Sequence, residues 1–153
     1  MPTKHQIMLN LKVLLEMIRF RMLKITTEQF AILADQAPKG GFTINSELRL
    51  KNTIDGSAVA VDMTFNFIKD EVKFMILKVL CEFGIHPEDL AKQTQEDKVT
   101  IPKDTIDFFI AQTVGTARGI LHCKTEGTPF NGIVMPPINV TGMIDSDLVI
   151  SLQ

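Results

Sequence analysis

A period-two alternation of apolar and polar residues, running in blocks between residues 18 and 83, constrains the fold more than any other feature. Successive side chains of a β-strand point to opposite faces of a sheet, so such blocks indicate strands with one face better buried than the other. The blocks fall at Ile18–Ile25, Phe42–Lys51, Val59–Phe67 and Val72–Phe83. The sequence therefore predicts four strands in its first half.

The connections between these blocks predict how the strands pair. Asp55-Gly56 and the short charged turn Lys69–Glu71 are typical of hairpins, so strands two to four form an antiparallel meander. The connection "TTEQFAILADQAPKGG" is too long for a tight hairpin. We therefore expect a packed crossover loop, with the first strand elsewhere in the sheet. Residues 7–17 fit either an extra helix turn or an extension of that strand.

The apolar period changes to 3.6 after the polar stretch "HPEDLAKQTQEDKVT". Thr100 and Pro102 supply a helix start, and the apolar stripe that follows indicates a helix over Lys103–Leu121, about 28 Å long. A short C-terminal segment follows. We predict a single α+β domain over residues 1–153, in which the helix packs on a four-stranded antiparallel sheet.

Gly115 and Gly119 lie four residues apart on this predicted helix. One interpretation is a close helix crossing at a subunit interface. The other is that the helix ends near Gly119 with a glycine cap. The fourth strand is apolar on both faces, which predicts that Phe74, Ile76 and Leu80 face a partner subunit.

The composition argues against several classes of function. The net charge is -2 and the Lys and Arg residues are scattered, so we expect no nucleic-acid partner. The apolar N-terminal run is interrupted by charges, so we expect no membrane insertion and a cytoplasmic location. Cys81 and Cys123 are expected to be reduced thiols.

No pattern of catalytic or metal-binding residues is recognisable. His5, His86 and His122 are far apart, and His122-Cys123 is a poor metal pair because adjacent helical residues point in different directions. Phosphate-binding loops and nucleophile elbows are absent from the sequence. We therefore expect no enzyme activity, no metal and no cofactor.

The stretch "TPFNGIVMPPIN" after the helix is almost free of charge although Gly and Pro mark it as a loop. Such a loop needs apolar surface to cover it. The chain also has 8 Met and 10 Phe but no Trp or Tyr, which favours adaptable apolar contacts with little hydrogen-bond direction. Both features are typical of a binding groove, and also of a Phe-rich core.

Three short motifs, in this order along the chain, resemble the SecB family of export chaperones. "VLCEFGI" is similar to that family's Leu-Cys-Glu segment, "ARGI" to its Arg-Gly step, and "MPPINVTGMI" to its Pro-x-Asn stretch. The similarity extends over roughly Phe20 to Ile144. It implies an ATP-independent chaperone, or holdase, for protein transport, which binds unfolded preproteins and assembles as a homotetramer, a dimer of dimers.

The resemblance also implies functional residues. A client-binding groove for unfolded protein is expected from Phe30, Ile32, Phe42, Ile44, Phe130, Ile133, Val134 and Met135. Contact with the translocation motor SecA is expected from Leu80, Glu82 and Glu28, and the oligomer interface from Phe74, Ile76, Gly115 and Gly119.

This chain departs from the family pattern in two places. Between Gly119 and Met135 it has about eight additional residues, which predicts a reshaped groove edge. Thr27 and Ala31 stand where the family has acidic residues, so we expect weak binding to SecA. Two alternatives are a SecB-like chaperone of a toxin-antitoxin pair and a small-molecule binding protein.

Overall fold

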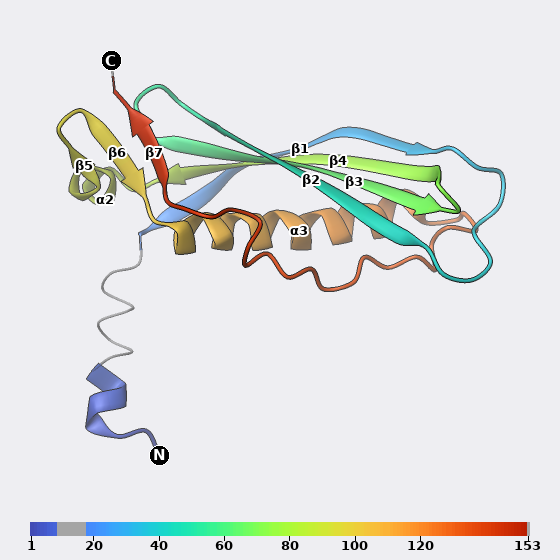
Figure 1. The fold of residues 1–153 in the computed structure, drawn as a ribbon, viewed down its shortest axis with the longest axis horizontal. Helices are drawn as coiled ribbons and strands as arrows, with labels where there is room; N and C mark the ends of the chain where they lie inside the picture. Colours follow the sequence, from blue (N-terminus) through green and yellow to red (C-terminus); the bar gives the residue numbers. More distant parts are fainter. Residues whose placement is uncertain (9–17, 153) are drawn as a thin grey trace.

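Four long antiparallel strands form the main sheet of the computed structural model, which describes residues 1–8 and 18–152 (Figure 1). The strands are β1 (Phe20–Ile32), β2 (Thr43–Asn52), β3 (Ala58–Lys69) and β4 (Val72–Ile85), in the order β1-β4-β3-β2. The predicted α+β fold and antiparallel meander are confirmed, and β1 lies at the edge beside β4. Residues 4–8 are helical. The rest of the 7–17 segment, whose structure the sequence left open, lies outside the described residues.

The two hairpins form where the sequence predicted them. Asp70 and Glu71 have φ of 50° and 64°, the left-handed conformation that a tight two-residue turn between β3 and β4 requires. At the β2–β3 turn the Asp55 carboxylate accepts hydrogen bonds from the Ser57 amide at 3.0 Å and from the Thr53 hydroxyl at 2.8 Å. The bonds from Ser57, followed by that from Thr53, lower the pKa of Asp55 to about 2.

β1 is longer than the sequence predicted. It continues to Ile32, because β4 has 14 residues and supplies partners such as Leu77 for Phe30 and Met75 for Ile32. The pairing shifts register between Met22 and Lys24 and again between Thr27 and Gln29. Each shift breaks the period of two, so the alternation ends before the strand does. The prediction that Phe30 and Ile32 lie in a crossover loop is therefore wrong, and residues 33–42 form that loop.

A second, smaller sheet caps one end of the molecule. The predicted polar stretch contains helix α2 (Pro87–Lys92) and strands β5 (Thr94–Gln95) and β6 (Lys98–Ile101). The C-terminal segment forms β7 (Leu148–Ser151), which pairs with β6 in the order β5-β6-β7. These strands have only two to four residues each, which is too short for an apolar period to be recognised in the sequence.

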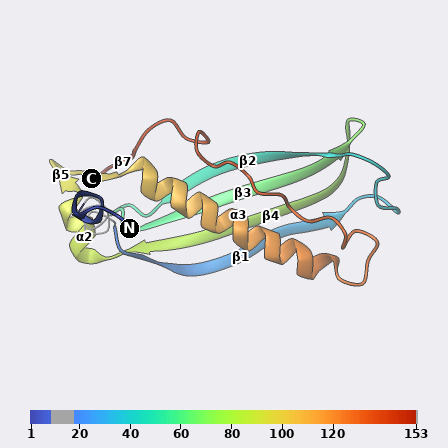
Figure 2. The same cartoon turned by 90° about the horizontal axis from the view of Figure 1, so that it is seen from below.

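Helix α3 (Lys103–Thr125) lies across one face of the main sheet (Figure 2). Its buried stripe is the predicted one, and it packs on β4 and β3. Thr100 lies in β6, and the helix begins after Pro102, where Asp147 Oδ1 accepts a hydrogen bond from the Lys103 amide at 2.8 Å. α3 continues past Gly119 to Thr125, so the glycine-cap interpretation is wrong.

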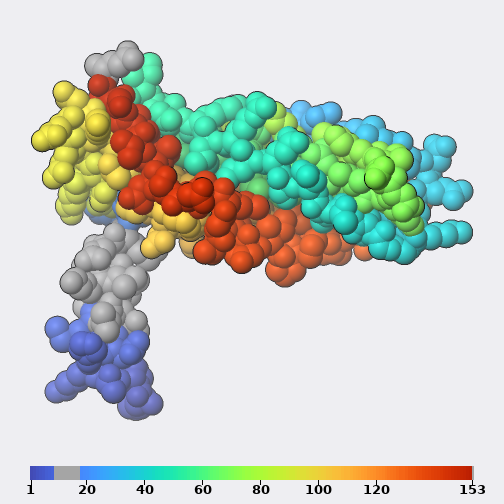
Figure 3. Space-filling model, in the orientation of Figure 1, coloured from blue at the N-terminus to red at the C-terminus, as the bar shows by residue number. Residues whose placement is uncertain are grey.

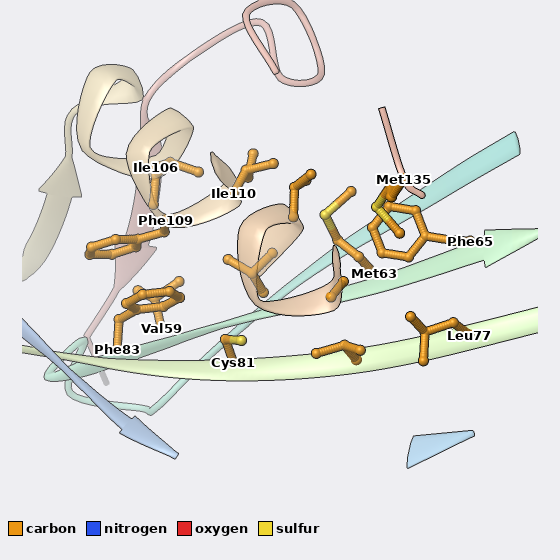
Figure 4. Packing of buried hydrophobic residues seen from close by; sticks show 14 of the residues in the cluster. Val59, Met63, Phe65, Leu77, Cys81, Phe83, Ile106, Phe109, Ile110 and Met135 are labelled. Carbon is orange, nitrogen blue, oxygen red and sulfur yellow. The ribbon is translucent and has the colours of Figure 1, made fainter. Parts of the chain in front are cut away.

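The core lies between α3 and the alternate side chains of β3 and β4 that face it (Figure 4). Phe83 and Phe109 stack with ring centroids 4.3 Å apart and an interplanar angle of 3°. On the opposite face of the sheet no helix of residues 1–8 and 18–152 packs, and this face is called the open face below. Ile76 and Leu80 lie on this open face and are half-buried.

Phe74 does not share the open face with Ile76 and Leu80. The β3–β4 ladder pairs Phe67 with Met75 and Ile68 with Lys73, which leaves Phe74 as an extra residue. Its ring turns toward the helix side and contacts the rings of Phe42, Phe67 and Phe130 at centroid distances of 5.7, 6.2 and 6.3 Å. The prediction that Phe74 points away from the core with Ile76 is therefore wrong, because this bulge reverses its direction.

An ion pair fixes the start of β1 to α2. Asp89 accepts hydrogen bonds from the Arg19 backbone amide at 2.7 Å and from the guanidinium at 3.0 and 3.1 Å. Glu88 accepts a further bond from Arg19 at 3.1 Å. Hydrogen bonds from the Arg19 side chain and backbone lower the pKa of Asp89 to about 2.

This contact predicts a specific acid sensitivity. Because the folded-state pKa of Asp89 lies below the ordinary value of 3.8 for an aspartate, its contribution to stability is complete above that value and is lost as the pH falls toward about 2. Asp89→Asn should therefore lower the free energy of unfolding at neutral pH. In urea unfolding experiments, the difference between wild type and variant should shrink between about pH 4 and pH 2. A difference that is constant over this range would contradict the assignment.

Candidate functional site

The segment that returns from α3 to β7, residues 126–147, is called the return segment here. Its apolar residues Phe130, Ile133 and Met135 are buried against the sheet, and Phe130 stacks on Phe74 with an interplanar angle of 25°. Figure 3 shows the return segment, in orange and red, lying against the cyan surface of β2. The charge-free loop is thus covered by the chain's own sheet.

Arg118 holds the return segment from the side of α3. Its Nε donates a hydrogen bond to the Met135 carbonyl at 2.8 Å, and its Nη2 donates one to the Pro136 carbonyl at 3.2 Å. A planar guanidinium can reach two successive carbonyl groups in this way, whereas a Lys ammonium is a single point charge. Arg118 therefore fixes the place where the return segment leaves the core.

An apolar groove opens just beyond this anchor, between β2 and the return segment. It has a volume of about 440 Å³ and is lined by Phe42, Ile44 and Ser46 on one side and by Val134, Pro136 and Ile138 on the other. The lining contains no charged residue. Val134 is 63% exposed, so an apolar wall of the groove is open to solvent.

The structure divides the predicted groove residues into three groups. Phe42, Ile44 and Val134 line the groove together. Phe130, Ile133 and Met135 lie buried beneath it and support its wall.

Phe30 and Ile32 are half-buried on β1, which β4 and β3 separate from β2. They therefore lie outside this groove.

Sequence reasoning did not place Ser46, Pro136 or Ile138 in the lining, and it did not recognise the role of Arg118. Ser46 continues the period of two that runs from Phe42 through Ile44, so the alternation could have found it. Arg118 sits beside the apolar stripe of α3, but which carbonyl groups it meets is decided by the path of the return segment.

The open face carries the residues predicted to contact a motor protein. Glu28 forms an ion pair with Lys78 at 3.2 Å. Asp62 forms ion pairs with Lys78 at 3.6 Å and with Lys51 at 3.3 Å. Glu28, followed by Asp62, raises the pKa of Lys78. Glu82 is paired in register with Lys24. Basic residues therefore neighbour both predicted acidic contacts.

The described part of the chain holds no group of three or more side chains that could bind a metal ion. Cys81 is buried, and this burial raises the pKa of its thiol; Cys123 is exposed, and both are free thiols. Among the described helices, none combines the length and apolar character needed to cross a membrane.

Comparisons with known proteins give a structural similarity but no match in sequence. No family model matches the sequence, and no curated protein matches it. Among solved structures, the chain is similar to the Mycobacterium tuberculosis Rv1957 SecB-like chaperone, determined in complex with a ChAD peptide from the Rv1956 HigA1 antitoxin. The two sequences are 13% identical, the match covers 79% of this chain and 91% of that chain, and the TM-score is 0.49.

The Arg118 contact can be tested by amide hydrogen exchange. Hydrogen bonds that involve a charged group contribute about 1.5–3 kcal/mol, so Arg118→Met should speed exchange at the amides of residues 130–135 at least about tenfold. Arg118→Lys should give nearly the same increase, because an ammonium cannot bridge both carbonyl groups. Unchanged exchange in both variants would show that the buried side chains alone hold the segment.

Proposed function

We propose that this protein is a chaperone that holds extended, non-native polypeptide in the groove between β2 and the return segment, without nucleotide. The observation that carries the proposal is the solvent-open, charge-free groove with apolar side chains on both walls. Apolar grooves of this kind bind mainly by removing side chains from water, which requires neither a cofactor nor a fixed client sequence.

The size of the groove suits transient holding. Burying one large apolar side chain contributes about 1.5–3 kcal/mol, and association itself costs several kcal/mol in lost freedom. A client that places a few such side chains in the groove would therefore bind with roughly micromolar affinity. The motif resemblance supports unfolded preproteins in the cytoplasm as the clients, and protein export as the purpose.

The groove can be tested with substitutions in its lining that spare the fully buried residues beneath it. Val134→Asp combined with Ile138→Asp should weaken suppression of aggregation of an unfolded protein, measured by light scattering without ATP, by several-fold. A charge in the groove must lose its hydration when a client binds. The matched control is Ile54→Asp, at an 80% exposed position in the β2–β3 turn. If the double variant stays folded and keeps full activity, the groove is not the client site.

The proposal includes assembly through the outer face of α3. Phe108 is 43% exposed there, and Gly115 and Gly119 are exposed on the same side of the helix. No side chain of the described residues lies within 4 Å of a Cβ placed on either glycine. A second copy could therefore approach this face closely. Ile76 on the open face is the remaining accessible residue of the predicted interface.

The Gly115→Leu variant tests assembly without disturbing the fold. Nothing in the described chain obstructs the new side chain, and replacing a helical glycine favours the helix, so the variant should remain folded. Sedimentation at micromolar concentration should show a dimer or tetramer for the wild type and a shift toward monomer for Gly115→Leu. Gly41→Leu, also at an unobstructed glycine, should assemble like the wild type. A monomeric wild type would refute this part of the proposal.

Binding to SecA through Leu80, Glu82 and Glu28 should be weak. Lys78 already pairs with Glu28, and exposed ion pairs contribute only about 0–1 kcal/mol each. Titration of a SecA tail peptide should give binding at low ionic strength that disappears at moderate salt. The Glu82→Lys variant should show no binding even at low ionic strength. A tight, salt-resistant complex would contradict this expectation.

A further inference from the structure

The two edges of the main sheet differ in how regular they are. β1 and β2 are the edge strands, and β1 carries two register shifts against β4. β2 pairs with β3 without any shift, from Thr43 opposite Ile68 to Asn52 opposite Val59. Bulges at an edge hinder the addition of another strand, whereas a straight edge is a template for it. β2 is therefore the edge at which a further strand can pair.

The backbone of β2 has free hydrogen-bonding groups on its outer side. In an antiparallel edge strand about every second residue points its N–H and C=O away from the sheet. Within residues 1–8 and 18–152, no backbone or side-chain group outside the β2–β3 ladder bonds to the β2 backbone. In particular, no backbone group of the return segment bonds to the β2 backbone, although both line the groove.

β2 provides both one wall of the groove and the free edge of the sheet. Ile44 and Ser46 of β2, and Phe42 directly before it, line the groove from alternate positions, which in a strand are about 6.8 Å apart. A strand added beside β2 would have the same spacing. Every second side chain of it would point to the groove side, toward Val134 and Ile138, and the others toward the charged row of Glu47, Arg49 and Lys51 on the open face.

We propose that the occupant of the groove is an extended peptide that pairs with the free edge of β2 as a fifth strand. Its chemistry is an unbroken backbone without Pro, with apolar side chains at alternate positions facing the groove and polar ones facing the open side. This inference rests on the proposed function and adds the mode of recognition. Backbone pairing provides an affinity common to all clients. The groove favours those clients whose apolar side chains stand at alternate positions.

Backbone N-methylation tests the pairing directly. The probe is a fluorescent ten-residue peptide with Phe or Ile at odd positions and Thr or Lys at even positions. It is compared with two versions that carry three N-methyl groups each, at odd or at even residues. Each version loses the N–H groups of one edge only, while both keep all side chains. Affinities for the full chain are measured by fluorescence anisotropy.

We expect one methylated peptide to bind at least about tenfold more weakly than the parent and the other to bind within about threefold of it. Equal affinities of the two methylated peptides would overturn strand pairing, while leaving apolar binding in the groove intact. Absence of binding by all three peptides would overturn both this inference and the proposed function. The Val134→Asp/Ile138→Asp variant should weaken binding of the parent peptide, which places the peptide at this groove.

Discussion

A single α-helix is too narrow to cover a sheet of four strands. Strands lie about 4.8 Å apart and a helix with its side chains is about 10 Å wide, so one helix covers roughly two strands. α3 covers β4 and β3, whose inward side chains are buried, and leaves the inward row of β2 half-exposed. The return segment supplies the missing cover for that row. Because this cover is a chain of loops and not a second helix, it is incomplete, and the groove is the part left open.

The regular parts of the fold could be predicted because their sequence pattern and their burial coincide. The alternation of Ile44, Leu48 and Leu50 with Glu47 and Arg49 gave β2 and its correct faces. The two turns and the buried stripe of α3 followed from equally local signals. These features depend on neighbours that are close in sequence, which a pattern can represent.

The remaining features depend on contacts that are distant in sequence. The end of β1 is decided by how much of β4 is available to pair, and Phe74 changes face because of a bulge opposite Phe67. The strand β7 exists because β6 offers an edge to it. At the groove, Phe42, Ile44 and Val134 were predicted from the sequence, but Pro136 and Ile138 were not, and neither was the exposure of each residue. Phe130 and Val134 have similar surroundings in sequence, and only the path of the return segment buries one and exposes the other.

Beyond the end of α3, the return segment is bonded to the helix by Arg118 at Met135 and Pro136, and again by the Lys103 amide at Asp147. Along the helix axis these points are about 22 Å apart, at a rise of 1.5 Å per residue. The chain between Pro136 and Asp147 could span about 40 Å if fully extended. The stretch from Pro136 to Asp147 is therefore much longer than the distance that it has to span. Of the groove residues on the return segment, only Ile138 lies in this stretch, whereas Val134 and Pro136 lie beside the Arg118 tie, so the two ends of this groove wall are held to different degrees.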